Sequence, residues 1–318
     1  MGNNTACTSF CDRFADFYPG LEEHMKRTLL NLNYIIKQAT QWTGGAFALL
    51  GLASTFVSLS DILDSNLSIW CRFLISVSIL AVFWFGTFIC CAIYLRCKRR
   101  MEIFEVNSGH HVYVQYGDIF SEDEVLEPDK RRNIVIPVNR CFDTLIDDDL
   151  ISSTSLHGIA MKRIYGSGAY DSNSLNEWMQ MNLKQQQIQA ESLDSLKKRK
   201  GNLGRYPVGC VSEVQVSSKC TFFFLGLTTL DEKLKASVSD VDYVTALMKL
   251  LEFCNTRSQG FPVVIPLIGG GLSRTAKMER DILEYLVKLI KLNRNLINCD
   301  IHIVVRDSGK NSIAITDI

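Results

Sequence analysis

The stretch "FPVVIPLIGGGLSRTAKMERDILEYL", residues Phe261 to Leu286, joins an apolar run to a helical pattern through three consecutive glycines. The run from Val263 to Ile268 is continuously apolar, which is typical of a parallel strand covered on both faces. A tight turn from strand to helix needs one or two glycines with positive φ. A third glycine indicates that something approaches the backbone closely, and N–H groups at a helix N-terminus favour an anion such as phosphate. A loose surface turn is the alternative interpretation.

The glycine junction differs from the two best-defined phosphate-binding motifs. No Gly-Lys-Ser/Thr follows the glycines, so the stretch is not a P-loop. The GxGxxG spacing is also absent, so it is not a dinucleotide-binding fingerprint. The class of ligand must therefore be inferred from the other segments of the chain.

Composition excludes several classes of protein. Lys+Arg and Asp+Glu are equal at 34 each in 318 residues, which argues against a general nucleic-acid surface. None of the 11 cysteines belongs to a CxxC pair, and their scatter fits reduced thiols inside a cell. No histidine stands at a metal-ligand spacing from a cysteine, so we expect no metal site. The first residues lack a basic region followed by an apolar one, so they do not form a secretory signal.

Two uncharged segments predict a helical hairpin in a membrane, within residues 42–96. Trp42 to Ser60 spans 19 residues without charge, and Phe73 to Leu95 spans 23. At a rise of ~1.5 Å per residue, each helix reaches ~28 Å or more, which is enough to cross a hydrocarbon core. A pair of buried core helices is the alternative.

Charges flanking the hairpin predict its orientation. The short connection "DILDSN" carries only Asp61 and Asp64, and Arg72 sits near the outer end of the second helix, where its side chain can snorkel. Basic residues flank the other ends: His24, Lys26, Arg27, Lys37 and the run Arg96 to Arg100. Because basic flanks remain in the cytoplasm, we expect a multi-pass protein of the inner membrane with both termini cytoplasmic. Residues 1–41 would form a cytoplasmic N-terminal segment, and Leu21 to Gln41 within it has the pattern of an amphipathic helix.

Residues 101–318 predict a cytoplasmic domain of the α/β class. Strand patterns occur at residues 111–120, 131–140, 210–216, 220–227, 261–268 and 299–305, and helix patterns at 155–165, 240–256 and 275–292. This alternation predicts a three-layer α/β/α domain with a mixed sheet. The polar stretch at residues 171–205 reads as a solvated helix and a mobile loop. We interpret its basic run, Lys197 to Lys200, as a solvated face.

Ligands of such domains bind at the carboxyl ends of the strands, beside helix N-termini. Three segments fit this description: Gly117-Asp118 after a strand, Ser155 to Gly158 at the start of a helix, and Gly269 to Gly271 at the start of another. One acid and two helix N-termini predict a site for a molecule that carries a base and a diphosphate.

These segments resemble the macro domain, the ADP-ribose-binding fold. The matching motifs are "GDIF" (Gly117 to Phe120), "IVIPVNR" (Ile134 to Arg140) and "VVIPLIGGGLSR" (Val263 to Arg274), in the family's order and spacing. The resemblance implies that Asp118 holds the adenine amine, with the backbone at Ile119 beside it. It also implies that the diphosphate and distal ribose contact Asn139, Arg140, Ser155, Leu156, His157 and Gly158. The phosphates would be wrapped by Gly269, Gly270, Gly271, Leu272, Ser273 and Arg274.

The chain departs from the macro-domain pattern in two places. Many macro domains read "VNAAN", whose second Asn supports hydrolysis, but here Phe142 occupies that place in "VNRCF". The glycine-rich first loop is replaced by "DDDLISSTSLHG", residues 147–158. These departures argue against a hydrolase and imply a different distal group on the ligand. Asp147, Asp148 and Asp149 are the carboxylates that a hydrolase would have to use instead, although an acidic surface loop is the simpler interpretation.

The combination of hairpin and macro domain resembles a narrower family, the membrane-bound macro-domain effectors of type II Thoeris anti-phage defence. That resemblance implies a non-enzymatic effector that takes histidine–ADP-ribose from a TIR-domain partner, with no other cofactor and no nucleic acid. Ligand binding would drive homo-oligomerisation and disrupt the membrane, causing abortive infection. The alternatives are a membrane-tethered ADP-ribosyl hydrolase and a passive ADP-ribose-binding adaptor.

Overall fold

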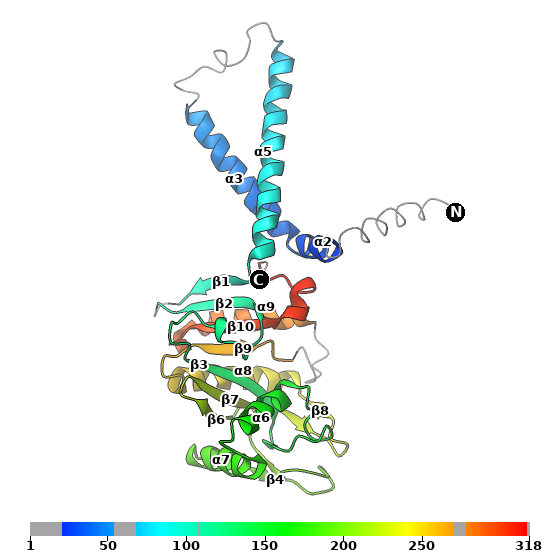
Figure 1. Ribbon diagram of the computed structural model, residues 1–318, viewed down its shortest axis with the longest axis vertical. Helices are drawn as coiled ribbons and strands as arrows, with labels where there is room; N and C mark the ends of the chain where they lie inside the picture. The colour runs from blue at the N-terminus through cyan, green and yellow to red at the C-terminus, as the bar shows by residue number, and fades with distance from the viewer. Residues whose placement is uncertain (1–20, 54–67, 107–108, 270–277, 317–318) are drawn as a thin grey trace, which may run out of the picture. The chain divides into compact units, whose positions relative to one another are not determined.

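The computed structural model describes residues 21–53, 68–106, 109–269 and 278–316. The chain divides into two compact units (Figure 1). The first contains residues 1–99 together with 311–317, and the second contains residues 100–310.

The first unit is helical in its described residues. It contains α2 (Leu21–Leu30), α3 (Leu32–Ala53) and α5 (Ile69–Cys97). Arg27 of α2 donates to the backbone carbonyls of Arg96 and Lys98, at 2.9 and 3.1 Å, and so covers the C-terminal end of α5. Helix α3 packs on α5 through a contact of 3.2 Å between the hydroxyls of Thr43 and Thr87.

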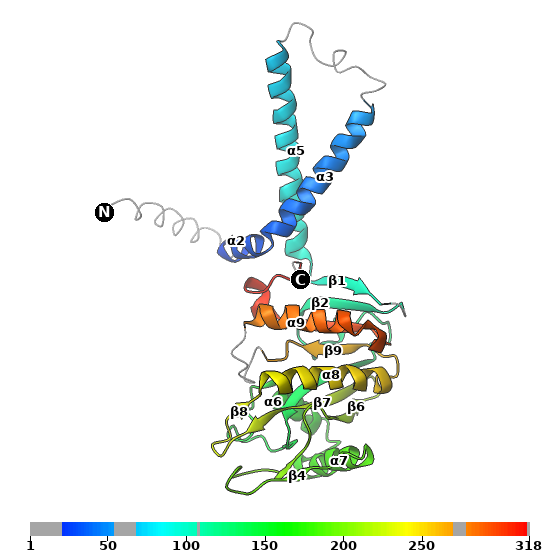
Figure 2. The same ribbon diagram turned by 180° about the vertical axis from the view of Figure 1, so that it is seen from behind.

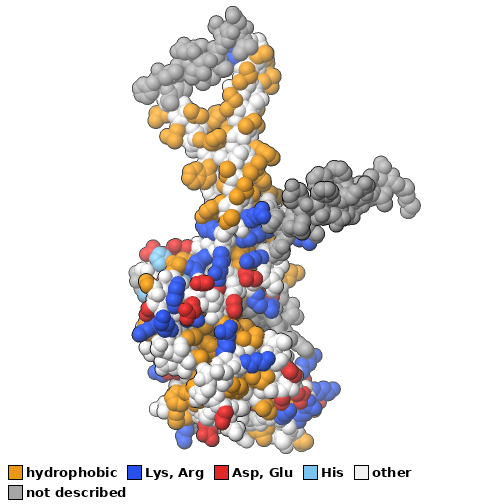
Figure 3. Space-filling model, in the orientation of Figure 1, with side chains coloured by type: hydrophobic (Ala, Val, Ile, Leu, Met, Phe, Trp, Pro, Cys, Tyr) orange, Lys and Arg blue, Asp and Glu red, His pale blue; other side chains and the backbone are white. Residues whose placement is uncertain are grey.

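Helix α5 is the one described helix that is long and apolar enough to cross a membrane by length and composition. Its apolar side chains face outward, as Figure 3 shows, and Trp70 is 76% exposed. Helix α3 runs without interruption from Leu32 through the start of the first predicted span, whose residues 54–60 lie outside the described part of the chain. The hairpin and its orientation therefore stay predictions.

The second unit is built on one mixed sheet in the strand order β1-β2-β10-β9-β3-β7-β6, with β8 paired to β7. The strands are β1 (Arg100–Glu105), β2 (His111–Gly117), β3 (Arg132–Asn139), β6 (Val211–Ser217), β7 (Cys220–Leu230), β8 (Ala236–Ser237), β9 (Val263–Pro266) and β10 (Ile301–Arg306). Neighbours from β2 to β7 pair in parallel, so the carboxyl ends of these strands lie along one edge. Strands β1, β6 and β8 are antiparallel to their neighbours.

Helices cover both faces of the sheet. In Figures 1 and 2, α6 (Leu156–Gly166) lies on one face, whereas α8 (Asp240–Arg257) and α9 (Glu279–Leu292) lie on the other. Alternation along β7 explains how both faces are packed, because successive side chains of a strand point to opposite sides. Phe222 and Phe224 join the core beneath α6, and the ring of Phe223 packs edge-on against Phe253 of α8 at 5.2 Å. The predicted three-layer α/β/α fold is confirmed.

The polar stretch at residues 171–205 is more structured than the sequence indicates. It forms α7 (Ser172–Gln185), which Asp171 begins with a capping box, and then a small pair of strands, β4 (Glu191–Ser192) and β5 (Gly204–Arg205). The interpretation of the basic run as a solvated face is wrong for Lys198, whose side chain is 0% exposed. Its charge is buried because the carboxylate of Asp143 lies beside it. We call residues 186–205 the insert.

Candidate ligand-binding pocket

A cavity of about 620 Å³ lies at the carboxyl edge of the parallel strands. Residues from the ends of all five parallel strands line it, among them Gly117, Asn139, Thr228, Pro266 and Arg306. The N-terminus of α6 and the loop before it form another wall. This is the position at which parallel α/β sheets bind ligands.

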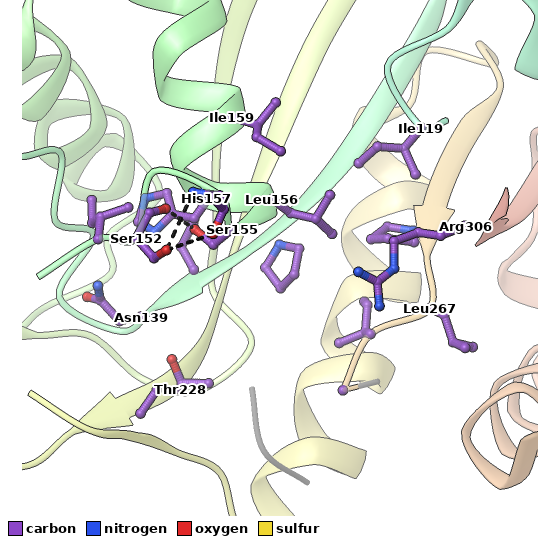
Figure 4. A pocket seen from close by; sticks show the side chains of 18 of the residues that line it. Ile119, Asn139, Ser152, Ser155, Leu156, His157, Ile159, Thr228, Leu267 and Arg306 are labelled. Carbon is purple, nitrogen blue, oxygen red and sulfur yellow. Dashed lines mark hydrogen bonds between the residues drawn. The ribbon is translucent and has the colours of Figure 1, made fainter. Parts of the chain in front are cut away.

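The cavity has two distinguishable ends. Figure 4 shows Ile119 and Arg306 on one side of it, and Asn139, Ser152 and His157 on the other. A ligand that reaches from the turn after β2 to the start of α6 would therefore span the pocket.

Asp118 stands at the first end, directly after β2, and is exposed. Its Oδ1 accepts the N–H of Phe120 at 3.1 Å, which fixes the carboxylate in the turn. Its other oxygen, Oδ2, has no hydrogen-bond partner among the described residues and is available to a ligand. A carboxylate held in this way is suited to accept from an exocyclic amine.

Glu124 holds the backbone of this turn from behind. It is 0% exposed, and its Oε1 accepts the N–H of Asp118 at 3.2 Å. The amide of Gln115 donates to the backbone carbonyl of Glu124 at 2.8 Å and also contacts its Oε2. Arg100, the first residue of β1, donates to the same carbonyl at 2.9 Å. Sequence reasoning missed Glu124, because "SEDE" reads as an ordinary exposed acidic loop.

Arg306 adds positive charge beside Asp118. It ends β10 in register with Gly117 of β2, so it flanks the turn that carries the acid. Its guanidinium is 65% exposed and lies 3.5 Å from the carboxylate of Glu279.

Arg163 and Lys235 also line the cavity, and the guanidinium of Arg163 stacks over the ring of Phe120 at 4.5 Å. Guanidinium groups suit phosphate oxygens geometrically. Sequence reasoning missed Arg306, although a charge that ends the apolar run "IHIVV" was a usable signal.

The N-terminus of α6 forms the second end. The Oγ of Ser155 accepts the N–H of Gly158 at 3.0 Å and donates to the carbonyl of Ser152 at 2.7 Å, so this hydroxyl caps the helix. The N–H groups of Leu156 and His157 have no partner among the described residues and remain available to an anion. Gly158 supports this end without lining the cavity, because a Cβ there would lie 2.2 Å from the carbonyl oxygen of Ser152.

Side chains of the motif "VNRCF" make contacts within the protein itself. Asn139 lines the cavity, but its Oδ1 accepts the N–H of Cys141 at 3.0 Å. Arg140 is not among the lining residues and donates through Nε to the carbonyl of Tyr206 at 2.8 Å. Phe142 has a φ of 52° and is 0% exposed, with its ring edge-on to Tyr206 at 5.6 Å. The place of the hydrolytic Asn is therefore filled by a hydrocarbon side chain in the core.

The glycine loop can be described only at its start. Gly269 has a φ of 99° and lines the cavity, and the hydroxyl of Tyr243 donates to the preceding carbonyl, of Ile268, at 2.9 Å. The predicted phosphate contacts from Gly270, Gly271, Leu272, Ser273 and Arg274 lie outside the described residues.

The insert fastens the loop that precedes α6. Nζ of Lys198 donates to both carboxylate oxygens of Asp143, at 3.0 and 2.7 Å, and to the carbonyl of Asn202 at 2.6 Å. Arg199 pairs with Asp149 at 2.7 Å. Lys200 pairs with Asp147, and this hydrogen bond lowers the pKa of Asp147 to about 2. The loop that replaces the family's glycine-rich loop is thus held by ion pairs.

His157 differs from its neighbours in the cavity wall. It is 8% exposed, and its Nε2 is buried without a hydrogen-bond partner among the described residues. Burial lowers the pKa of its imidazole to about 3, and a weaker opposing effect comes from a hydrogen bond to the backbone of Asp143. The ring is therefore neutral at physiological pH. No group of His, Cys, Asp and Glu within the described ranges could hold a metal ion.

Comparison with known proteins shows the family to which the chain belongs. Residues 112–306 match the family "Thoeris protein ThsA, Macro domain". This match covers more than half of the chain, so the protein belongs to that macro-domain family. It is similar to Thoeris protein ThsA of Bacillus amyloliquefaciens (strain Y2), with 26% identity over 233 residues, which are 73% of this chain and 70% of that protein.

Solved structures give only a distant likeness. A macrodomain mutant of Oceanobacillus iheyensis has a TM-score of 0.40 and 11% identity, and the match covers 67% of this chain and 88% of that one. A protein from Bacteroides thetaiotaomicron has a TM-score of 0.35 and 13% identity, with coverage of 60% and 96%. The assignment to the family rests on the sequence match.

Proposed function

We propose that this protein is a membrane-anchored effector of Thoeris anti-phage defence whose macro domain senses an ADP-ribose derivative. One observation carries the proposal: a single cavity of about 620 Å³ joins the Asp118 turn to the N-terminus of α6. Asp118 offers an acceptor for the adenine amine, and the free N–H groups at α6 offer donors for a phosphate. The cations that line the cavity favour the same diphosphate.

The signal would be histidine–ADP-ribose supplied by a TIR-domain partner, as the resemblance to type II Thoeris effectors implies. The loop "DDDLISSTSLHG" supports a distal group unlike that of ordinary macro-domain ligands, because it replaces the glycine-rich loop of the family. Titration calorimetry of the full-length protein in detergent would compare ADP-ribose with its histidine adduct. We expect the adduct to bind more tightly.

The site favours binding over turnover. Phe142 occupies the place of the Asn that supports hydrolysis in the family, and its side chain is buried in the core. A hydrolase is the second candidate, because Asp148 and Asp149 line the cavity. Each already has a partner: Asp148 accepts the N–H of Ser153 at 2.7 Å, and Asp149 pairs with Arg199. Steady consumption of the ligand would favour the hydrolase.

The output would be ligand-driven assembly that disrupts the membrane. The apolar helix α5 supports a membrane anchor, and the predicted hairpin carries no ring of charges that would form an open pore at rest. We expect the histidine adduct to shift the detergent-solubilised protein to a larger mass in light scattering after size exclusion. Dye uptake by cells should require both the ligand and the hairpin. Tight binding without a change in mass would favour the passive adaptor.

The proposed topology has its own test in a background without native cysteines. A cysteine at Asn66, in the predicted outer connection, should react with an impermeant thiol reagent in whole cells. A cysteine at Glu232, an exposed residue of the second unit, should react only after lysis. The reverse pattern would overturn the orientation.

A further inference from the structure

The carboxylate of Asp118 projects from a turn in which the other polar groups of this residue are already paired. Its N–H donates to Oε1 of Glu124 at 3.2 Å, and its carbonyl accepts the N–H of Ser121 at 2.8 Å. Its Oδ1 accepts the N–H of Phe120 at 3.1 Å, so Oδ2 is the oxygen left for a ligand. The position of Oδ2 therefore depends on the three contacts that hold Asp118.

Glu124 makes the one contact of the three that comes from outside the turn. Its side chain is 0% exposed, so the carboxylate lies among protein atoms and not in water. Burying a carboxylate is unfavourable unless it is paired or hydrogen-bonded. A charge retained there beside a single backbone N–H indicates that it fixes the place of the turn.

Buried side chains fix Glu124 in its turn. The amide nitrogen of Gln115, which is 0% exposed, donates to the carbonyl of Glu124 at 2.8 Å and contacts its Oε2. The oxygen of the same amide contacts Nε of Arg100 and lies 3.3 Å from Nδ1 of His302. An amide oxygen only accepts, so both nitrogens donate to it and Gln115 cannot rotate without losing them. These partners lie on β1, β2 and β10, three adjacent strands, so Glu124 is anchored to the sheet.

We propose that Glu124 is a positioning residue for base recognition. Its hydrogen bond to the N–H of Asp118 sets where Oδ2 of Asp118 meets the exocyclic amine of the ligand. Glu124 is not among the residues that line the cavity, so it acts through Asp118. This inference rests on the proposed function, because it takes an adenine nucleotide as the occupant. A hydrogen bond is sensitive to small displacements, since its donor and acceptor must lie about 2.7–3.2 Å apart.

The test compares ADP-ribose with inosine diphosphate ribose, in which an oxygen replaces the amine of the base. Both ligands are titrated calorimetrically into the full-length protein in detergent. We expect wild type to prefer ADP-ribose about tenfold or more, because the oxygen cannot donate to the carboxylate of Asp118.

Two conservative variants separate positioning from charge. Glu124→Asp keeps the charge but is one methylene shorter, which withdraws the carboxylate from the N–H of Asp118. We expect its preference for ADP-ribose to fall to about threefold or less. Glu124→Gln keeps the length and an oxygen for that N–H, so it should retain more of the preference than Glu124→Asp. Its amide nitrogen faces that of Gln115, so a lower Tm should accompany the retained preference.

Glu127 provides a matched control in the same loop. It is partly buried, and within the described ranges its carboxylate makes no hydrogen bond to residues 118–121. Glu127→Asp should therefore leave the ratio of the two affinities unchanged.

Several outcomes would overturn the inference. Equal weakening of both ligands in Glu124→Asp would mean that Glu124 only supports the wall of the pocket. An unchanged ratio in that variant would mean that the position of Oδ2 does not depend on it. A lower ratio in Glu124→Gln than in Glu124→Asp would assign the effect to the charge. If wild type bound both ligands equally, Asp118 would not read the base, whereas binding of neither ligand would remove the proposed function itself.

Discussion

The ammonium nitrogen of Lys198 lies 2.7 Å from Oδ2 of Asp143, and the two side chains are 0% and 1% exposed. Fifty-five residues separate them in the sequence. Because each buried charge needs the other as its counter-charge, this pair joins the insert to the loop that precedes α6.

Removing one partner of this pair should destabilise the protein severely. Lys198→Met leaves a buried carboxylate without its counter-charge, which costs about 3–5 kcal/mol. For a domain of this size, this corresponds to a fall in Tm of roughly 6–20 °C. Thermal unfolding of the full-length protein in detergent measures it. Arg199→Ala is the matched control, because the ion pair of Arg199 with Asp149 is 56% and 45% exposed and should contribute less than ~1 kcal/mol. Equal Tm values for the two variants would contradict the burial of Lys198.

Gly201 should be intolerant of alanine. Its φ is +82°, and a Cβ would lie 2.3 Å from Oδ1 of Asp143, where the buried pair leaves no room. Gly260 has a φ of +75° with nothing within 4 Å, so Gly260→Ala measures the backbone strain alone, about 1–2 kcal/mol. We expect Gly201→Ala to lower Tm clearly more than Gly260→Ala. The same shift in both variants would show that the loop around Asp143 can adjust.

The buried histidines predict a loss of stability in mild acid. Burial lowers the pKa of His157 and of His302 to about 3, below the ordinary value of 6.5. The unfolded chain therefore binds more protons than the folded one between these values, and stability falls as pH drops below 6.5. Each histidine should remove about 1 kcal/mol between pH 6.5 and about pH 5.5.

The histidines and the carboxylates change the stability of the protein in different pH ranges. The pKa of Asp147 is lowered to about 2 from 3.8, so its contribution to stability is present above pH 3.8 and is lost only in stronger acid. His302→Phe should halve the slope of unfolding free energy against pH within the window, whatever its effect on absolute stability. A wild-type protein with equal Tm at both ends of the window would contradict the neutral, buried state of the rings.

Asp118 should control recognition of the base. Asp118→Ala removes the acceptor for the adenine amine, and losing a charge-assisted hydrogen bond costs ~1.5–3 kcal/mol, or tenfold or more in affinity. Asp118→Asn keeps an oxygen that can accept the N–H of Phe120, so it separates the charge from the geometry of the turn. Calorimetric titration with ADP-ribose measures both variants. Unchanged affinity in a folded Asp118→Ala protein would show that the carboxylate does not contact the base.

The fold could be predicted because the apolar runs and helical patterns that specify it lie within short segments of the sequence. Continuously apolar runs such as Val263–Pro266 marked the parallel strands, and their order placed Asp118, His157 and Gly269 along one edge. Those three residues do line one cavity. This agrees with the general observation that parallel α/β sheets bind ligands at the carboxyl ends of their strands.

Other parts of the site could not be predicted, because they depend on contacts between distant segments. The sequence indicated that Lys198 is solvated, because the basic run alone does not show that the carboxylate of Asp143, 55 residues earlier, lies beside it. Glu124 read as a surface acid, although it is buried against the turn that it supports. Arg140 belongs to a ligand-binding motif of the family, yet here its Nε bonds the carbonyl of Tyr206. A single sequence does not show which of several equivalent charges is buried.

The packing of Phe142 limits which side chains its position can hold. Its ring lies 3.1 Å from the position of a Cβ on Gly226, and it packs edge-on against Tyr206. An asparagine introduced there would empty part of the core, at a cost below the ~3–5 kcal/mol of truncating a buried Phe to Ala. It would also bury an amide without a partner, at a further ~1–3 kcal/mol. Phe142→Asn alone is therefore expected to destabilise the domain unless neighbouring side chains change with it.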